Sequence, residues 1–129
     1  MFPELPPFAH FLGIKLISVT PQRVESELLV REEFTNYNGV MHGGALMGYA
    51  DNMGGLTSRQ SLKPGQRTTT IESKTNFFAG VAIGEIARSV STPLHIGRST
   101  IVVETRITRA DGKLAAIVTQ TQMVLNPKE

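Results

Sequence analysis

The sequence contains no cysteine and no tryptophan among its 129 residues. The missing cysteine excludes disulfides, thiolate metal sites, iron–sulfur ligation and a cysteine nucleophile. Neither charge dominates, because 13 Lys and Arg against 11 Asp and Glu give a net charge of +2, which is too small for a general nucleic-acid-binding protein. No apolar run approaches the roughly 20 residues that span a bilayer, and the first residues lack the basic and apolar regions of a secretory signal. We therefore expect a cytoplasmic protein with no nucleic-acid partner and no membrane partner.

Other signatures of known chemistry are missing as well. The three histidines, His10, His42 and His95, are isolated in the sequence and give no metal-ligand pair, so we expect no metal. Neither glycine-rich phosphate-binding pattern is present, and no serine lies in a G-x-S-x-G elbow. We also expect no bound cofactor.

Hydrophobic residues make up 40% of the chain, enough for one core, and the length suits one domain that covers residues 1–129. Residues 1–12 form an N-terminal extension, in which prolines precede a short helical turn over 8–12 that ends at Gly13. Two strands, over 14–19 and 24–30, form a hairpin, and a polar loop over 31–42 follows. We find no internal repeat and no linker that would divide the chain.

One long helix is predicted from Gly43 to about Leu62, because apolar residues recur there at steps of three and four and no proline interrupts them. Its five glycines weaken the helix by up to about 1 kcal/mol each relative to alanine. We therefore expect its surroundings to hold it, with backbone or ligand packed close against it.

The rest of the chain has the composition of β-strands, which we place at 68–78, 81–92, 99–107 and 114–125. Ala79-Gly80 offers a tight turn, the Asp111-Gly112 pair favours a hairpin turn, and Pro93 fits a bulge or an edge. Short turns between successive strands predict a four-strand antiparallel meander. The fold class is α+β, with a curved antiparallel sheet wrapped around one central helix.

The start of this helix carries the first candidate for chemistry. The backbone N–H groups of Gly43 and Gly44 have no partner within the helix, and the absence of Cβ atoms lets a ligand approach them. They are candidates to stabilise a developing oxyanion, although the same glycines also fit a plain helix start.

Asp51 is the second candidate, since it is the one acidic residue between Glu33 and Glu72. Its carboxylate can serve as a nucleophile or as a general base, or it can be a solvated helix residue or an ion-pair partner of Arg59. Gly43 lies eight residues before it, about 12 Å away along one helix. A single reacting carbonyl cannot reach both, so joint action requires two chains, with the site at their interface.

The run Asn36-x-x-Gly39-x-x-His42-Gly43-Gly44 followed by Asp51 resembles the signature of PaaI-like hotdog-fold acyl-CoA thioesterases. The later segments 92–98 and 111–115 also match that family's pattern, so the resemblance covers roughly residues 10 to 125. It implies a hotdog fold, hydrolysis of an acyl-CoA thioester to a carboxylic acid and CoA, and a homodimer or homotetramer.

The resemblance also implies roles for single residues. Asp51 attacks the thioester carbonyl or activates water, and the Gly43 N–H of the opposite subunit holds the thioester oxygen. His42 orients that region and assists the leaving thiolate, and Asn36 positions water or the thioester. Many relatives carry Ser or Thr one turn after the carboxylate, where this chain has Gly55, and Thr70 is the nearest substitute.

For the CoA portion of the substrate, the family lines its channel at positions that correspond to His95, Gly97, Arg98 and Ser99. Gly44 is a further candidate for substrate binding. Arg98 is the best candidate for a phosphate contact, and a solvated arginine at a strand end is the alternative. Phe77 and Phe78 fit either an acyl pocket or the core.

Two other functions are compatible with the same fold. A hotdog acyl-thioester dehydratase would form a double bond and release no thiol, and one such group follows its histidine with Phe-Pro-Gly where this chain has Gly-Gly. A non-catalytic acyl-CoA-binding sensor would bind CoA esters without turnover.

Overall fold

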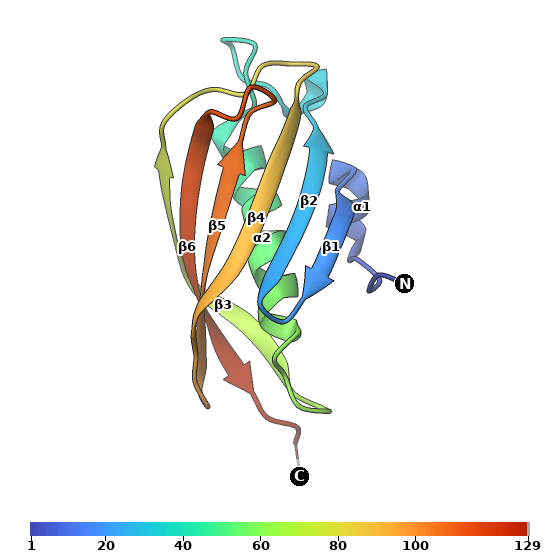
Figure 1. The fold of residues 1–129 in the computed structure, drawn as a ribbon, viewed down its shortest axis with the longest axis vertical. Coiled ribbons are helices and arrows are strands. Elements are labelled where there is room, and N and C mark those ends of the chain that lie inside the picture. Colours follow the sequence, from blue (N-terminus) through green and yellow to red (C-terminus); the bar gives the residue numbers. More distant parts are fainter. Residues whose placement is uncertain (129) are drawn as a thin grey trace.

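The computed structural model describes residues 1–128, which form a single sheet curved around one long helix (Figure 1). The elements in chain order are α1 (Pro7–Leu12), β1 (Lys15–Thr20), β2 (Arg23–Leu29), the 3-10 helix η1 (Glu32–Phe34), α2 (Gly43–Arg59), β3 (Arg67–Phe77), β4 (Ile86–Ile96), β5 (Thr100–Thr108) and β6 (Leu114–Leu125). This is the α+β hotdog architecture that the resemblance implies. The short helix over 8–12, the first hairpin and the long central helix are confirmed, although α2 ends at Arg59 rather than near Leu62.

The sheet has six antiparallel strands in the order β1-β2-β4-β5-β6-β3. The prediction of a four-strand meander is therefore wrong, because β3 pairs with β6 at one edge and does not pair with β4. The hairpin between β5 and β6 is confirmed, with Gly112 at a φ of 86° in its turn. The ladder between β4 and β5 shifts register between Pro93 and His95, so the predicted bulge at the proline is also confirmed.

The segment 78–85 explains the error, because it joins strands that lie apart in the sheet and forms no tight turn at Ala79-Gly80. Its backbone is hydrogen-bonded to the loop before α2, since Met41 N donates to Val81 O at 2.7 Å and Ile83 N donates to Gly39 O at 3.1 Å. Val81 is buried beneath this crossing. A buried apolar residue with extended backbone pairing has the sequence pattern of a strand, which is why the predicted strand at 81–92 starts too early.

The core lies between the concave face of the sheet and α2. Tyr49, Ala50 and Met53 of α2 are fully buried, as are Val24, Ala87 and Ile107 of the facing strands. The glycines of α2 let neighbours approach as expected, since a Cβ on Gly48 would lie 2.9 Å from the Phe8 ring of α1. Among residues 1–128 no helix is long and apolar enough to cross a membrane.

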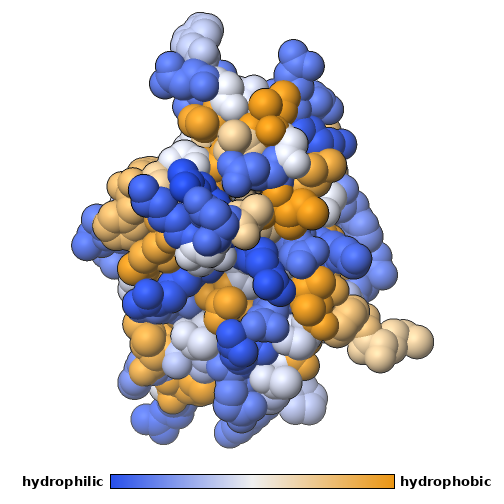
Figure 2. All heavy atoms as spheres, turned by 45° about the horizontal axis from the view of Figure 1, so that its top comes forward, coloured by the Kyte–Doolittle hydropathy of each residue, from blue (hydrophilic) through white to orange (hydrophobic). Residues whose placement is uncertain are grey.

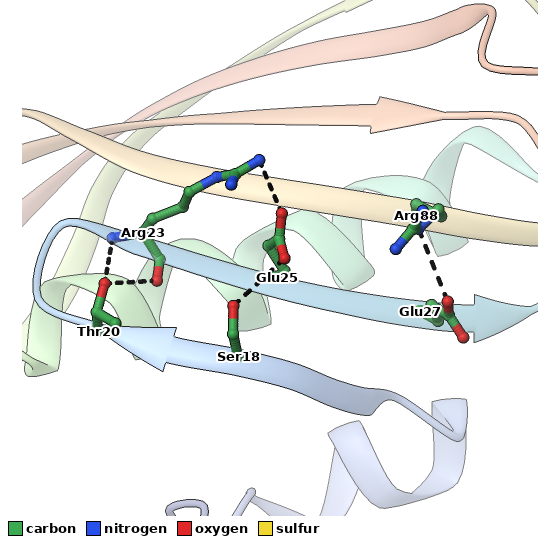
Figure 3. A network of polar contacts seen from close by, with 6 residues as sticks. All are labelled: Ser18, Thr20, Arg23, Glu25, Glu27 and Arg88. Carbon is green, nitrogen blue, oxygen red and sulfur yellow. Dashed lines mark hydrogen bonds and ion pairs between the residues drawn. The ribbon is translucent and has the colours of Figure 1, made fainter.

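The outer face of the β1-β2-β4 end is polar and carries paired charges (Figure 3). Glu25 accepts from Ser18 at 3.3 Å and pairs with Arg23 at 2.7 Å, and Arg88 lies 3.7 Å from Glu27. The charge network of Figure 3 lies on the side of the sheet that faces away from α2. Apolar and polar side chains are interspersed on the face shown in Figure 2.

Candidate active site

The N-terminus of α2 forms the first half of the candidate site. His42 is the N-cap residue, and its Nδ1 accepts a hydrogen bond from Gly44 N at 2.8 Å. An accepting Nδ1 leaves the proton of the neutral ring on Nε2, which becomes a donor at the surface. The Gly44 N–H is thus engaged within the chain. By contrast, no hydrogen-bond acceptor within residues 1–128 reaches the Gly43 N–H.

Asn36 shapes the loop that leads into this helix. Its Oδ1 accepts from Asn38 N at 2.8 Å and from Val40 N at 3.4 Å, and Gly39 in the same turn has a φ of 72°. The amide NH₂ of Asn36 remains available as a donor. A hollow of 320 Å³ beside this loop is lined by both Asn36 and Gly43. The helix start and the loop therefore present donors to one hollow.

Phe77 of β3 and Phe78 after it also line this hollow, and more than half of each side chain is exposed. A Cβ on Gly43 would lie 3.2 Å from the Phe77 ring. Of the two alternatives for these residues, the structure favours a pocket lining over the core.

Asp51 forms the second half of the site, in the middle of α2. It lines a cleft of 660 Å³, of which one wall is the N-terminal segment Pro3–Pro6. The Thr70 hydroxyl donates to Asp51 Oδ1 at 3.0 Å, so the structure brings together the carboxylate and the hydroxyl that the sequence suggested. Arg59 lines the same cleft, yet no ion pair joins it to Asp51 within the described residues.

Two glutamines on β6 complete the surroundings of Asp51, and the sequence analysis missed both. Gln120 Nε2 donates to Asp51 Oδ1 at 3.0 Å, and Gln122 Nε2 donates to Thr70 Oγ1 at 2.7 Å and to Gln120 Oε1 at 2.9 Å. Both glutamines are 2% exposed. A signal was present, because the two-residue period of this strand continues from Ala116 and Val118 to positions 120 and 122. Polar residues at such inward positions indicate a specific partner.

The two halves of the site lie apart within one chain. Gly43 and Asp51 are separated by eight residues of an uninterrupted helix, about 12 Å along its axis. Each half has its own hollow, one lined by Gly43 and Phe77 and the other by Asp51 and Thr70. Strand β3 contributes Thr70 to one half and Phe77 to the other.

The predicted CoA-binding residues lie elsewhere, at the end of β4 and in the turn before β5. This turn is closed by the Gly97 N–H, which donates to Thr100 O at 2.8 Å, and a Cβ on Gly97 would lie 2.6 Å from His95 Nε2. Arg98 and Ser99 are exposed, and Ser99 O accepts from Val124 N at 2.8 Å. None of these four residues lines either hollow within the part of the chain that the structure describes.

Comparison with known proteins identifies a matching family, related sequences and similar structures. The model of the thioesterase superfamily matches residues 38–116. A protein of Saccharolobus solfataricus that bears the provisional name of an esterase is 34% identical over 118 residues, which are 92% of this chain and 83% of that protein. The 1,4-dihydroxy-2-naphthoyl-CoA hydrolase of Listeria monocytogenes is 28% identical over 106 residues, 82% of this chain and 85% of the hydrolase. The structure of the Escherichia coli PaaI protein superposes with a TM-score of 0.82 at 21% identity, covering 89% of this chain and 86% of that one.

Proposed function

The chain belongs to the thioesterase superfamily, and we propose that it hydrolyses an acyl-CoA thioester to a carboxylic acid and free CoA, with Asp51 as the reacting carboxylate. One observation carries this proposal: the Asp51 carboxylate lines a 660 Å³ cleft and is held there through Oδ1 alone. No hydrogen bond from residues 1–128 reaches Oδ2. The Listeria relative, named as a CoA hydrolase, supports the substrate class.

Two routes use this carboxylate. As a nucleophile, Asp51 bonds to the thioester carbonyl carbon, the C–S bond breaks, CoA leaves as its thiolate, and water then hydrolyses the mixed anhydride. As a general base, Asp51 takes a proton from a water molecule that attacks the same carbon, after which the C–S bond breaks, CoA leaves as its thiolate and the acid is released. Both routes place negative charge on the carbonyl oxygen, so both need an oxyanion donor.

The donor we propose is the Gly43 N–H of the partner subunit. Within one chain this group lies about 12 Å from Asp51, whereas a reacting carbonyl must lie about 3 Å from its donor. The β3 edge of the sheet offers the surface that a second copy needs, since β3 is one of the two terminal strands (Figure 1). This strand has 11 residues, and Ile71 on it is about half exposed.

The register of such a pairing can be worked out from the two halves of the site. Thr70 marks the Asp51 half and Phe77 marks the Gly43 half. The bulge between Thr70 and Glu72 leaves Ile71 out of the register of β3. An antiparallel β3–β3 pair therefore places Thr70 opposite Phe77 of the partner subunit when its two-fold axis passes through Lys74. In that register each helix start faces the other chain's carboxylate, and two sites form per dimer.

The remaining candidate residues take supporting roles in this proposal. The His42 Nε2–H and the Asn36 amide are donors beside the oxyanion site, where they assist the leaving thiolate and position the thioester. Thr70 orients Asp51 and the water. We assign Gly44, through its backbone, to the wall of the same site.

His95, Gly97, Arg98 and Ser99 remain our candidates for the CoA portion of the substrate. Because they lie outside both hollows, they can serve only where a bound CoA extends beyond the reacting centre. A second dimer that packs against the first would complete the tetramer.

The test is thiol release from a panel of aryl- and alkyl-CoA esters, with wild type and Asp51→Ala side by side. We expect the substitution to lower turnover by about 100-fold or more, since a lost nucleophile or base costs at least about 2.7 kcal/mol of barrier. Undiminished turnover of Asp51→Ala would remove this carboxylate from the mechanism. Silence across the panel, with CoA esters still raising the melting temperature, would favour a binding module instead.

A complementation experiment tests the shared site. Gly43→Val blocks the oxyanion donor in one chain, and Asp51→Ala removes the carboxylate in the other. When the two inactive variants are refolded together, half of the dimers are mixed, and each of these has one intact site. About one quarter of wild-type activity should return. If the site lies within a single chain, the mixture stays inactive.

A further inference from the structure

The glutamine pair on β6 has no role in the reaction as described above, although it is the most heavily buried polar group beside Asp51. Gln120 and Gln122 are each 2% exposed and face α2 from the same side of the strand as Val118. Burying two amides is costly unless their hydrogen bonds are made, and two apolar side chains would fill this space at less cost. Packing alone therefore does not explain why these two buried residues are glutamines.

The hydrogen bonds of the pair all run toward one atom. Gln122 Nε2 uses its two protons on Thr70 Oγ1 and Gln120 Oε1, at 2.7 and 2.9 Å. Because the Thr70 oxygen already accepts one proton, its own proton is left to donate to Asp51 Oδ1 at 3.0 Å. Because Gln120 Oε1 is occupied in the same way, its NH₂ faces Asp51 Oδ1, also at 3.0 Å. One amide thus fixes the direction of both donors that hold the carboxylate.

The helix is shaped to admit this arrangement. A Cβ at position 54 would lie 1.8 Å from Gln120 Oε1 and 2.5 Å from its Cδ, so only glycine leaves room for the amide across α2. Glycine in mid-helix costs about 1 kcal/mol relative to alanine. The close approach of the Gln120 amide explains why position 54 is glycine despite this cost.

From these contacts we infer that Gln120 and Gln122 are positioning residues for the thioesterase reaction, with Gln122 setting the direction of the hydrogen bonds that hold Asp51. They act through the carboxylate: Gln120 lines neither hollow, and Gln122 reaches the wall of the Asp51 cleft with only 2% of its surface exposed. Asp51 Oδ1 is the anchored oxygen, and Oδ2 is the one presented to the thioester or to the attacking water. This inference rests on the proposed function.

The test uses Gln120→Met and Gln122→Met, which keep the length and volume of the side chain and remove the amide. We expect kcat to fall by about 10- to 100-fold in each, because a small misplacement of a reacting group has effects of this size, while KM changes by less than about 3-fold. Thr105→Val is the control, because it also removes one buried polar group, here a hydroxyl that is bonded to Ser91 at 2.7 Å and makes no contact with Asp51. Its kcat should stay within about 2-fold of wild type.

A double-mutant cycle separates positioning from general damage. In an Asp51→Ala background, Gln122→Met should lower the residual rate no further, since the group it positions is gone. Near-wild-type kcat in both glutamine variants would overturn the inference, and so would an undiminished effect of Gln122→Met on the Asp51→Ala chain.

Failure of the proposed function gives a different pattern. In that case wild type itself releases no thiol, and crystal structures of wild type and Gln122→Met decide the positioning. A displaced Asp51 carboxylate in the variant supports the inference. A carboxylate that keeps its contact with Thr70 overturns it.

Discussion

Substitution of alanine for glycine should change the stability of the protein in opposite directions at two neighbouring positions of α2, Gly54 and Gly55. An alanine in mid-helix is favoured over glycine by about 1 kcal/mol. At Gly55 a new Cβ meets nothing within 4 Å, so this gain should be realised in full. At Gly54 the Cβ would lie 1.8 Å from Gln120 Oε1, and Gln120 is buried with no room to swing into solvent.

The cost at Gly54 follows from what Gln120 must give up. Moving its amide breaks the hydrogen bonds to Asp51 and from Gln122, about 1 kcal/mol each, and repacking a filled site adds at least about 1 kcal/mol. After the gain in helix propensity, Gly54→Ala should destabilise the protein by about 2 kcal/mol. Gly55→Ala should stabilise it by about 1 kcal/mol. At about 3 °C per kcal/mol, the melting temperatures should move by about 6 °C down and 3 °C up.

Chemical and thermal denaturation of the two variants measure this difference directly. A third comparison isolates the contact: in a Gln120→Ala background the clash is gone, so Gly54→Ala should become stabilising. If Gly54→Ala raises the melting temperature of the otherwise unchanged chain, the packing of Gln120 across the helix is refuted. The same conclusion follows if the sign does not change in the Gln120→Ala background.

Three further predictions concern the site, the core and the surface. Thr70→Val should lower kcat about 10-fold, and Gly55→Ser, which restores a hydroxyl one turn after the carboxylate, should recover part of it in a thiol-release assay. Burial raises the pKa of Tyr49 to about 12, so between about pH 10 and 12 the unfolded chain loses this proton while the folded one keeps it. The free energy of unfolding should therefore fall with rising pH, by up to about 1.4 kcal/mol per unit, and urea titrations of Tyr49→Phe should lack this component. Arg88→Ala removes an exposed ion pair with Glu27 and should change the free energy of unfolding by less than about 0.5 kcal/mol.

The sequence predicted those parts of the fold that depend on local signals. α2 has the helical period, the turn at Asp111-Gly112 has its preferred dipeptide, and Pro93 has the restrictions that place it at a bulge. The strand order was not predictable in this way. Sequential strands usually pair, and nothing in the composition of β3 shows that it lies at the far edge beside β6. The crossing segment 78–85 was misread because its buried Val81 and extended backbone imitate a strand.

The candidate site likewise has a part that local sequence signals predict and a part that only the folded structure shows. Asp51 and Gly43 were identifiable because each departs from its local context, one as a lone acid in an uncharged stretch and the other as a glycine at a helix start. Thr70 was named through the resemblance, and the 3.0 Å contact with Asp51 was beyond any local pattern. The residues expected to hold CoA were likewise named by resemblance, and they lie outside both hollows of the single chain.

Gln120 and Gln122 show which further signal a sequence can carry. The inward positions of β6 read Ala116, Val118, Gln120 and Gln122, and the change from apolar to amide side chains occurs without a break in the strand. An exposed glutamine carries little information about a site. A glutamine at a position that the two-residue period assigns to the core must find a hydrogen-bond partner or destabilise the fold. Here the partner is Asp51, the carboxylate that we propose to react. Polar residues in phase with a buried strand face are therefore as informative about a site as an isolated charge, and in this chain they indicate the side from which Asp51 is held.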